Sequence, residues 1–317
     1  MGEYMSYHAV LWVCLAVPIL HLILFTTMPE TPSYLLKCGK VEEARDALAW
    51  LRCRDGSEPA VDNELQNLLL ELEQTKSGQL TDAFKTLITD RSTFRAFRIT
   101  LTIIVARELC GCLAVLHFAS LIFSKASAGG MLLTPNQQAA VLGLVQIVGS
   151  FTASSLVEKV GRKPLLGMTC FLSGIGMTAL GAWFFAHGDE TSGTAWIPIV
   201  ALCLCIYCDA AGLQPVPFVI MTEMFSFQIR GTVTAILIAF ACGLVSIELR
   251  LFQPIASSVG LYFIFWLFAG VCLVSTVYIA LVVPETKMRT IDEIYAEIGG
   301  KSAKSKEIDC EADVTKL

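Results

Sequence analysis

The sequence predicts an all-α integral membrane protein with about seven transmembrane helices. Hydrophobic residues make up 55% of the chain, charged residues only 16%, and the mean hydropathy is +0.64. Soluble domains, by contrast, have about 25% charged residues. The charge-free stretches are also long, and one span of the hydrocarbon core needs only about 20 apolar residues. Stretches without Lys, Arg, Asp or Glu cover residues 4–29, 126–157, 164–188 and 251–284.

The apolar segments predict seven helices. We expect them at residues 6–28, 95–124, 137–157, 164–187, 195–221, 232–255 and 259–283. The first segment differs from a signal peptide, because it carries Glu3 where a signal has Lys or Arg. No small-residue cleavage site precedes Pro29 either. We therefore interpret this segment as a true membrane span.

The domain organisation that we expect follows from these spans. Residues 1–28 form the first transmembrane helix, and residues 29–94 form a polar cytoplasmic loop. The loop should contain short amphipathic helices, since Val41–Arg52 has apolar residues at helical spacing. Residues 95–287 form a six-helix bundle. The polar, charged tail at residues 288–317 is expected to be partly disordered.

The basic residues predict the orientation, because Lys and Arg are enriched in cytoplasmic loops. Nearly all of them reach the cytoplasm if residues 29–94, the loop at Lys159–Lys163, the turn at Arg230 and the tail lie there. Only Lys125 then falls outside. The prediction is an N-terminus outside and a C-terminus in the cytoplasm.

A rhodopsin-like receptor also has seven spans and an outside N-terminus. Such receptors have a short loop after the first helix, whereas residues 29–94 form a long one here. The sequence also lacks Asp-Arg-Tyr at the end of the third helix and Asn-Pro-x-x-Tyr in the seventh. These differences argue against a receptor.

The twelve cysteines and four histidines raise the question of a metal site. Most cysteines lie in apolar segments, where a free Cys behaves as a small buried hydrophobe. Cys203, Cys205 and Cys208 are close in sequence, but residues two and three apart on one helix do not converge as tetrahedral ligands. We predict no metal, no cofactor, no catalytic residue and no nucleic-acid partner, and the sequence has no nucleotide-binding glycine loop.

Five motifs follow one another along the chain, four of them at span ends or loops and one within the fifth predicted span. They are Pro29–Leu36 with Gly39 and Lys40, Glu158 with Gly161–Lys163, Gly212 with Pro215 and Pro217, Glu223–Phe225 with Ile229–Gly231, and Pro284–Lys287. In this order they resemble the sugar porter family of the major facilitator superfamily. Within that family they are most similar to the insect facilitated trehalose transporter-like members. The resemblance covers residues 6 to 298.

This resemblance implies a fold and a set of roles. The chain corresponds to the last helix of the N-terminal half and the six-helix C-terminal bundle of a major facilitator, whose solute path lies between two halves. In that register five spans are missing, so we expect an incomplete chain or a shortened isoform. The implied cytoplasmic gating network, whose alternative is a set of merely interfacial charges, comprises Glu30, Glu158, Arg162, Lys163, Glu223, Arg230 and Glu285.

Helix-breaking residues and departures from the family mark the expected solute path. Glycines and prolines interrupt spans where a cavity is lined; here they are Gly111, Gly212, Pro215 and Pro217. The family has Gln-Gln-x-x-Gly-x-Asn where this chain has Arg107-Glu108-Leu109-Cys110-Gly111-Cys112-Leu113. Gln214 stands where the family has a Gly, and Phe218 stands where it usually has a Trp. Much of the hexose-binding polar set is therefore absent.

Charged residues within the spans are costly and usually functional or paired. The charged residues of this kind are Arg107, Glu108, Asp209, Glu248 and Arg250. Our hypothesis is that Arg107 and Asp209 form an ion pair across the cavity. The alternatives are that the charges lie in a water-filled cavity or reflect drift in a non-functional copy. His117 lies on the helical face of Arg107, where it either couples protons or is satisfied locally.

The function predicted from these residues is secondary transport of a small polar, sugar-like solute through the plasma membrane. An alternative is a transporter-like sensor, or a truncated isoform that binds a partner and does not transport. A further alternative is a transporter for a charged solute, with Arg107 as its anion contact. The expected partners are the solute and the lipid bilayer, with either an oligomer or a missing N-terminal half.

Overall fold

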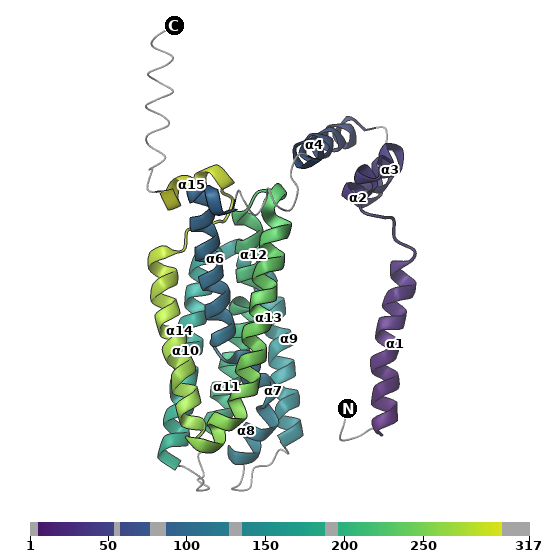
Figure 1. Ribbon diagram of the computed structural model, residues 1–317. Helices are drawn as coiled ribbons and strands as arrows, with labels where there is room; N and C mark the ends of the chain where they lie inside the picture. Colours follow the sequence, from purple (N-terminus) through teal and green to yellow (C-terminus); the bar gives the residue numbers. More distant parts are fainter. Residues whose placement is uncertain (1–5, 54–57, 77–86, 127–134, 188–195, 300–317) are drawn as a thin grey trace. The chain divides into compact units, whose positions relative to one another are not determined.

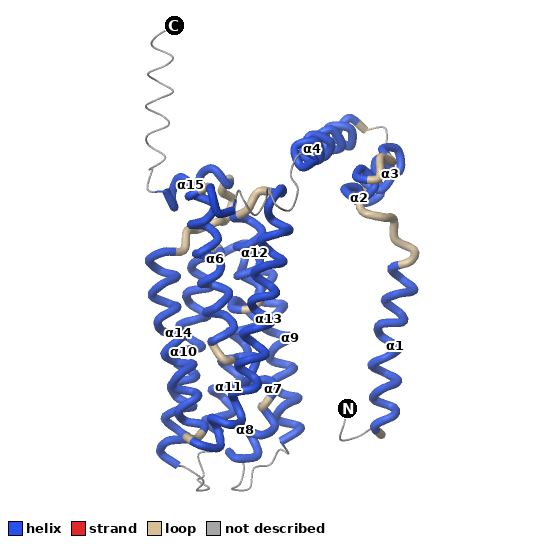
Figure 2. Tube along the Cα trace, viewed as in Figure 1, coloured by secondary structure: helices blue, strands red, loops and turns tan. Residues whose placement is uncertain are grey.

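The computed structural model describes residues 6–53, 58–76, 87–126, 135–187 and 196–299. Within these ranges every regular element is helical and none is a strand (Figure 2). The predicted all-α class is therefore confirmed. The chain divides into two compact units, Met1–Asp82 and Ala83–Leu317, which are described separately.

The first unit begins with α1 (Tyr7–Phe25), an apolar helix with no buried residue. Its 19 residues correspond to about 28 Å at 1.5 Å per residue, close to the thickness of the hydrocarbon core. Exposed apolar side chains surround it, including Trp12 and Phe25. The helix thus has the length and surface of a membrane span.

Three shorter helices complete the described part of the first unit: α2 (Pro32–Lys37), α3 (Val41–Arg52) and α4 (Pro59–Lys76). The α3 bounds agree with the predicted amphipathic helix. Its apolar face packs with the other two helices around a small core that includes Leu36, Leu48 and Leu65. Ion pairs tie α3 to α4, with Arg52 2.5 Å from Glu64 and Arg45 3.0 Å from Asp62.

The second unit is a bundle whose long helices run side by side (Figure 1). Its first three spans contain α6 (Arg91–Leu109), α7 (Cys112–His117), α8 (Ala119–Ala126), α9 (Pro135–Val160) and α10 (Arg162–His187). The remaining elements are α11 (Trp196–Cys208), the π-helix η1 (Asp209–Leu213), α12 (Pro215–Met224), α13 (Phe227–Ser258), α14 (Leu261–Val282) and α15 (Ile291–Gly299).

Seven stretches in the described residues are long and apolar enough to cross a membrane. They are Tyr7–Phe25, Arg91–His117, Ala140–Val160, Arg162–His187, Trp196–Met224, Ile229–Ser258 and Leu261–Val282. The predicted number of spans is confirmed, with shifted ends. The second span begins earlier than expected because Asp90 caps its first turn, accepting hydrogen bonds from the backbone N–H groups of Ser92 and Thr93. Such polar ends are invisible to hydropathy alone.

Helix α10 packs mainly against α14 and α11. Small residues permit this approach, as in other membrane helix pairs. A Cβ added at Gly176 would lie 2.6 Å from the Cys205 sulfur, and one at Gly174 would lie 3.2 Å from the Cys272 Cβ. The buried core runs along these contacts through residues such as Met177.

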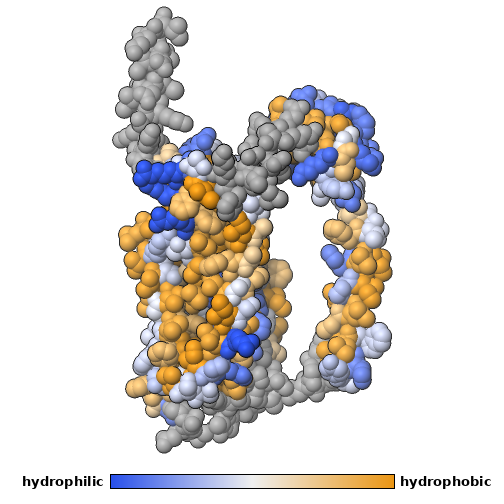
Figure 3. Space-filling view, viewed as in Figure 1, coloured by the Kyte–Doolittle hydropathy of each residue, from blue (hydrophilic) through white to orange (hydrophobic). Residues whose placement is uncertain are grey.

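On the side of the second unit that Figure 3 shows, the long helices present mostly apolar side chains. Phe151 on α9 is 74% exposed, and Leu281 on α14 is 79% exposed. Such a surface suits lipid or a further helix bundle rather than water. Among the described residues, α15 is the amphipathic helix that ends the unit, and Arg95 of α6 donates a 2.6 Å hydrogen bond to the carbonyl of Ile298 at its end.

Candidate functional site

The first interrupted span breaks at Gly111. Helix α6 ends at Leu109, α7 starts at Cys112, and Gly111 between them has a φ of +78°. A side chain is strained at this φ, and a Cβ here would lie 2.1 Å from the ring of Phe268. Glycine is thus required for both backbone conformation and space. The predicted helix-breaking role of this residue matches its position.

The second interrupted span breaks at η1, one turn of π-helix between α11 and α12. Pro215 has no N–H group, and its ring would clash with the carbonyl four residues earlier in a regular helix. The preceding N–H, of Gln214, instead donates to the Asp209 carbonyl five residues back at 2.8 Å. Gly212 lies inside this wide turn. Pro215 begins α12, and Pro217 is buried within it.

An ion pair of adjacent residues lies at the first break. The Arg107 guanidinium donates through Nη1 to Oε1 of Glu108, and their side chains are 11% and 1% exposed. The Arg107 Cζ also lies 5.2 Å from the centre of the Phe218 ring, a cation–π contact that joins α6 to α12. Within the described residues, Arg107 Nε and Glu108 Oε2 have no hydrogen-bond partner.

The predicted ion pair between Arg107 and Asp209 is absent from the described residues. The guanidinium instead pairs with Glu108, because this neighbouring carboxylate is almost fully buried and would otherwise be an unpaired charge. Asp209 is 8% exposed. One of its carboxylate oxygens lies within 4.8 Å of the sulfurs of Cys110 and Cys112.

The other predicted solute-path residues differ in their surroundings. Gln214 and Phe218 are half-buried and one helical turn apart, so they share a face of the interrupted span. Glu248 on α13 has both carboxylate oxygens buried without a hydrogen-bond partner in the described part of the chain. His117 is exposed, and its Nδ1 lies 2.8 Å from the carbonyl of Leu113 in its own helix. This contact corresponds to the local alternative for His117.

A second polar cluster joins the ends of three helices. Arg162 at the start of α10 donates through Nη2 and Nε to Glu223 Oε1 near the end of α12, at 2.7 and 3.2 Å. The other Glu223 oxygen accepts a 2.6 Å hydrogen bond from the hydroxyl of Thr286, which follows α14. Glu223 thus bridges α10, α12 and the segment after α14.

Glu285 completes this cluster as a cap on α10. Its carboxylate accepts hydrogen bonds from the backbone N–H groups of Arg162, Lys163 and Lys287, at 3.0, 3.1 and 3.0 Å. Gly161 makes the approach possible, because its φ is +101° and a Cβ there would lie 2.8 Å from a Glu285 oxygen. Free N–H groups at a helix start favour a negative charge.

The remaining residues of the predicted network lie outside this cluster, or form a hydrogen bond to a backbone group instead. Arg230 donates through Nε to the Phe225 carbonyl at 3.2 Å. Glu158 is exposed, and no hydrogen bond or ion pair of its side chain is present among the described residues. Glu30 belongs to the first unit. Sequence reasoning missed Thr286, although it lies in the motif with Glu285.

The comparisons with known proteins agree with this architecture. The family described as "Sugar (and other) transporter" matches residues 1–297. Facilitated trehalose transporter Tret1 of Drosophila pseudoobscura pseudoobscura is 29% identical over 302 residues, which are 95% of this chain and 34% of that protein. Tret1 of Culex quinquefasciatus is 27% identical, with 95% of this chain and 57% of that protein covered.

Solved structures with the same fold include the proton:xylose symporter XylE. With 6-bromo-6-deoxy-D-glucose bound, it aligns at a TM-score of 0.67 and 22% identity, over 88% of this chain and 56% of that one. The inward open conformation of XylE from E. coli aligns at 0.62 and 22% identity, over 88% and 53%. This chain therefore spans between about a third and little more than half of the proteins that it resembles.

Proposed function

The chain belongs to the sugar (and other) transporter family, and from this premise we propose that it forms part of a secondary transporter for a small polar, sugar-like solute. The observation that carries the proposal is the pair of interrupted spans, at Gly111 and at Asp209–Leu213. Interrupted helices at membrane depth are tolerated where they line a cavity or pack on protein, and in transporters they commonly form the solute site.

The side chains at these breaks support binding of a polar solute. Phe218 offers an aromatic face, and the amide of Gln214 offers both donors and an acceptor. The Nε of Arg107 and the Oε2 of Glu108 are buried without hydrogen-bond partners in the described residues. Because such groups are costly when unpaired, they favour a solute that brings its own hydrogen bonds. Glu248 extends the proposed path on α13.

The proposed path needs a second helix bundle opposite this one. Among the spans of the second unit, α9 and α13 have the smallest buried share, and α1 in the first unit has none. In transporters of this type, two halves rock about a central site. We assign the second half either to additional residues of the same polypeptide or to a partner chain.

The same proposal assigns the regions and their sides. Residues 1–28 act as the sixth helix of the family, 29–94 as a cytoplasmic loop, 95–287 as the C-terminal bundle and 288–317 as a cytoplasmic tail. The N-terminus is outside, and the protein resides in the plasma membrane. The cluster around Glu223 gates the cytoplasmic end, and the chain performs no covalent chemistry.

Uptake into liposomes tests this function. The protein should be the product of the native transcript, with any in-frame extension upstream of Met1, and the solutes should be trehalose, a hexose and a charged sugar derivative. Arg107→Gln should lower uptake of the preferred solute about 10–100-fold, as expected when a charge-assisted hydrogen bond of about 1.5–3 kcal/mol is lost. Val274→Ala is the matched control, because Val274 is 71% exposed on α14.

The pattern of uptake separates the alternatives. A preference for the charged derivative that disappears in Arg107→Gln would indicate the charged-solute transporter. Absence of uptake for all three solutes, by protein that is correctly inserted and monodisperse, would contradict transport. The sensor or partner-binding isoform would then be favoured.

A further inference from the structure

Two cysteines and an aspartate meet where the two interrupted spans break. Cys110 and Cys112 flank Gly111, and Asp209 begins η1. One ligand atom from each of the three side chains lies within 4.8 Å of the other two. All three residues are buried. We propose that Cys110, Cys112 and Asp209 form a binding site for a thiophilic divalent cation, with Zn²⁺ as the best fit.

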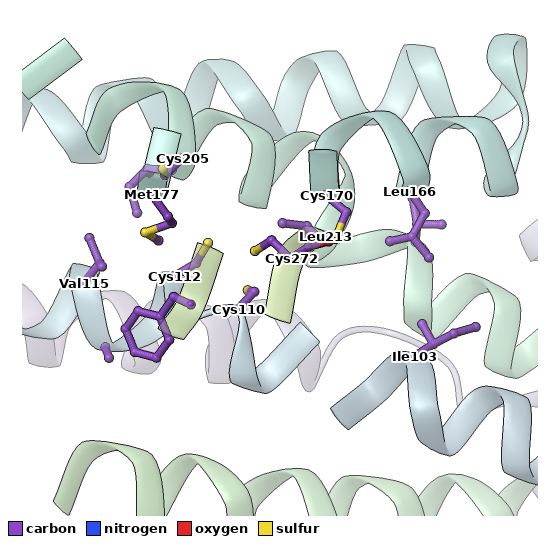
Figure 4. Close-up of a cluster of buried hydrophobic side chains, with 14 of the residues drawn as sticks. Ile103, Cys110, Cys112, Val115, Leu166, Cys170, Met177, Cys205, Leu213 and Cys272 are labelled. Carbon is purple, nitrogen blue, oxygen red and sulfur yellow. Dashed lines mark hydrogen bonds between the residues drawn. The ribbon is translucent and has the colours of Figure 1, made fainter. Parts of the chain in front are cut away.

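The backbone break explains why the two sulfurs converge. In a regular helix, residues two apart point about 200° away from each other, given 3.6 residues per turn. The left-handed conformation of Gly111, with a φ of +78°, changes the chain direction between Cys110 and Cys112. Figure 4 shows both sulfurs facing the interior of the same buried cluster. The spacing of these two cysteines alone therefore gave no indication of a site.

Asp209 supplies the charge that distinguishes this cluster from ordinary buried cysteines. Asp209 is only 8% exposed. No hydrogen bond or ion pair of its side-chain carboxylate is present in the described part of the chain. Burial of a carboxylate without a partner is costly. A bound cation removes that cost and also stabilises the thiolate form of the two cysteines.

The ligand set selects the metal. In a tetrahedral Zn²⁺ site, bonds of about 2.3 Å to sulfur place two sulfurs about 3.8 Å apart, so small side-chain adjustments suffice here. Mg²⁺ and Ca²⁺ require six or more oxygen ligands, and Cu(I) favours an all-sulfur site. Two thiolates and one carboxylate suit Zn²⁺ and leave a fourth position open to water or to a solute hydroxyl.

Metal content tests the proposal independently of uptake. The full chain should be purified in detergent with a reductant, stripped with a chelator, loaded with Zn²⁺, desalted and analysed by elemental mass spectrometry. We expect one equivalent per chain. Loading with Co²⁺ should give the sulfur-to-cobalt charge-transfer band of a thiolate site. Binding should weaken in acid, because the two thiols must lose protons.

Substitutions then assign the ligands. Cys110→Ser, Cys112→Ser and Asp209→Asn should each weaken binding by more than about tenfold, since even changes beyond the ligand shell cost about 10–100-fold. Asp209→Cys should retain the metal, because a thiolate replaces the carboxylate, and this rescue separates ligand loss from misfolding. Cys203→Ser and Cys242→Ser serve as matched controls and should bind like the wild type, because neither residue is in the cluster.

Three outcomes would overturn the site. The first is wild-type protein that keeps no metal after loading and desalting. The second is an unchanged equivalent of metal in the Cys110→Ser/Cys112→Ser variant, which would place the metal elsewhere. The third is Co²⁺-loaded protein that lacks the sulfur-to-cobalt charge-transfer band.

Discussion

Substitution of Gly111 by alanine tests how the first interrupted span is built. The new residue would keep a φ of +78°, which costs a non-glycine residue about 1–2 kcal/mol. Its Cβ would also lie 2.1 Å from the Phe268 ring, far inside contact distance. Relief of such overpacking typically costs about 1–3 kcal/mol. The two costs together are about 2–5 kcal/mol.

Thermal unfolding in detergent, followed by tryptophan fluorescence, measures this cost. At about 2–4 °C per kcal/mol for a unit of this size, the apparent Tm of Gly111→Ala should fall by about 4–20 °C. Gly243→Ala is the matched control, because Gly243 lies within α13 and a Cβ there meets nothing within 4 Å. That variant should be neutral, or more stable by about 0.5–1 kcal/mol.

A Gly111→Ala Tm within about 2 °C of the wild type would refute this reasoning. Such a result would mean that the span relaxes into a regular helix or that Phe268 moves aside freely. Equal losses in both glycine variants would also refute it, since the two positions differ in φ and in available space.

Two further predictions concern the polar ends of the spans. Glu223→Ala should destabilise the protein by about 1–3 kcal/mol, because it removes the ion-pair partner of the largely buried Arg162. The control Glu158→Ala changes an exposed side chain and should shift the Tm by less than about 2 °C. Equal Tm shifts in the two variants would contradict the stabilising role of the cluster. Asp90→Ala should cost about 1 kcal/mol through loss of the helix cap. Hydrogen bonds from Thr93 lower the pKa of Asp90 below its usual value, so its contribution is complete above pH 4 and is lost as the pH falls through the lowered pKa. The Tm values of the wild type and Asp90→Ala should therefore converge in acid. A Tm difference that stays constant with pH would show that the ionised carboxylate does not cause the stabilisation.

Much of the helical architecture was predictable because it rests on local signals. Length and apolarity define spans such as Leu261–Val282, which agrees with the predicted helix at 259–283 to within two residues. Helix spacing likewise predicted Val41–Arg52. The span ends were less predictable, because caps such as Asp90 extend a helix into polar sequence.

The site was predictable only where one residue type has one strong structural effect. Pro215 lacks a backbone N–H group, and Gly111 tolerates a positive φ, so both residue types are local signals of a helix break. The predicted pairing of Arg107 with Asp209 was wrong, because ion pairing depends on the direction of the side chains and on competition from Glu108. The closeness of Asp209 to the cysteines was likewise hidden, since it depends on two helix breaks facing each other.

The capping of α10 by Glu285 makes one end of the bundle more rigid than its middle. Through Glu285 and Glu223, the start of α10, the end of α12 and the chain after α14 are pinned together at one end. A shift of any one of these three helix ends therefore pulls on the other two. In the transport that we propose, the deformation that admits a solute falls on the middle of the bundle while these contacts hold. We expect the two breaks, at Gly111 and at Asp209–Leu213, to act as the hinges of this deformation.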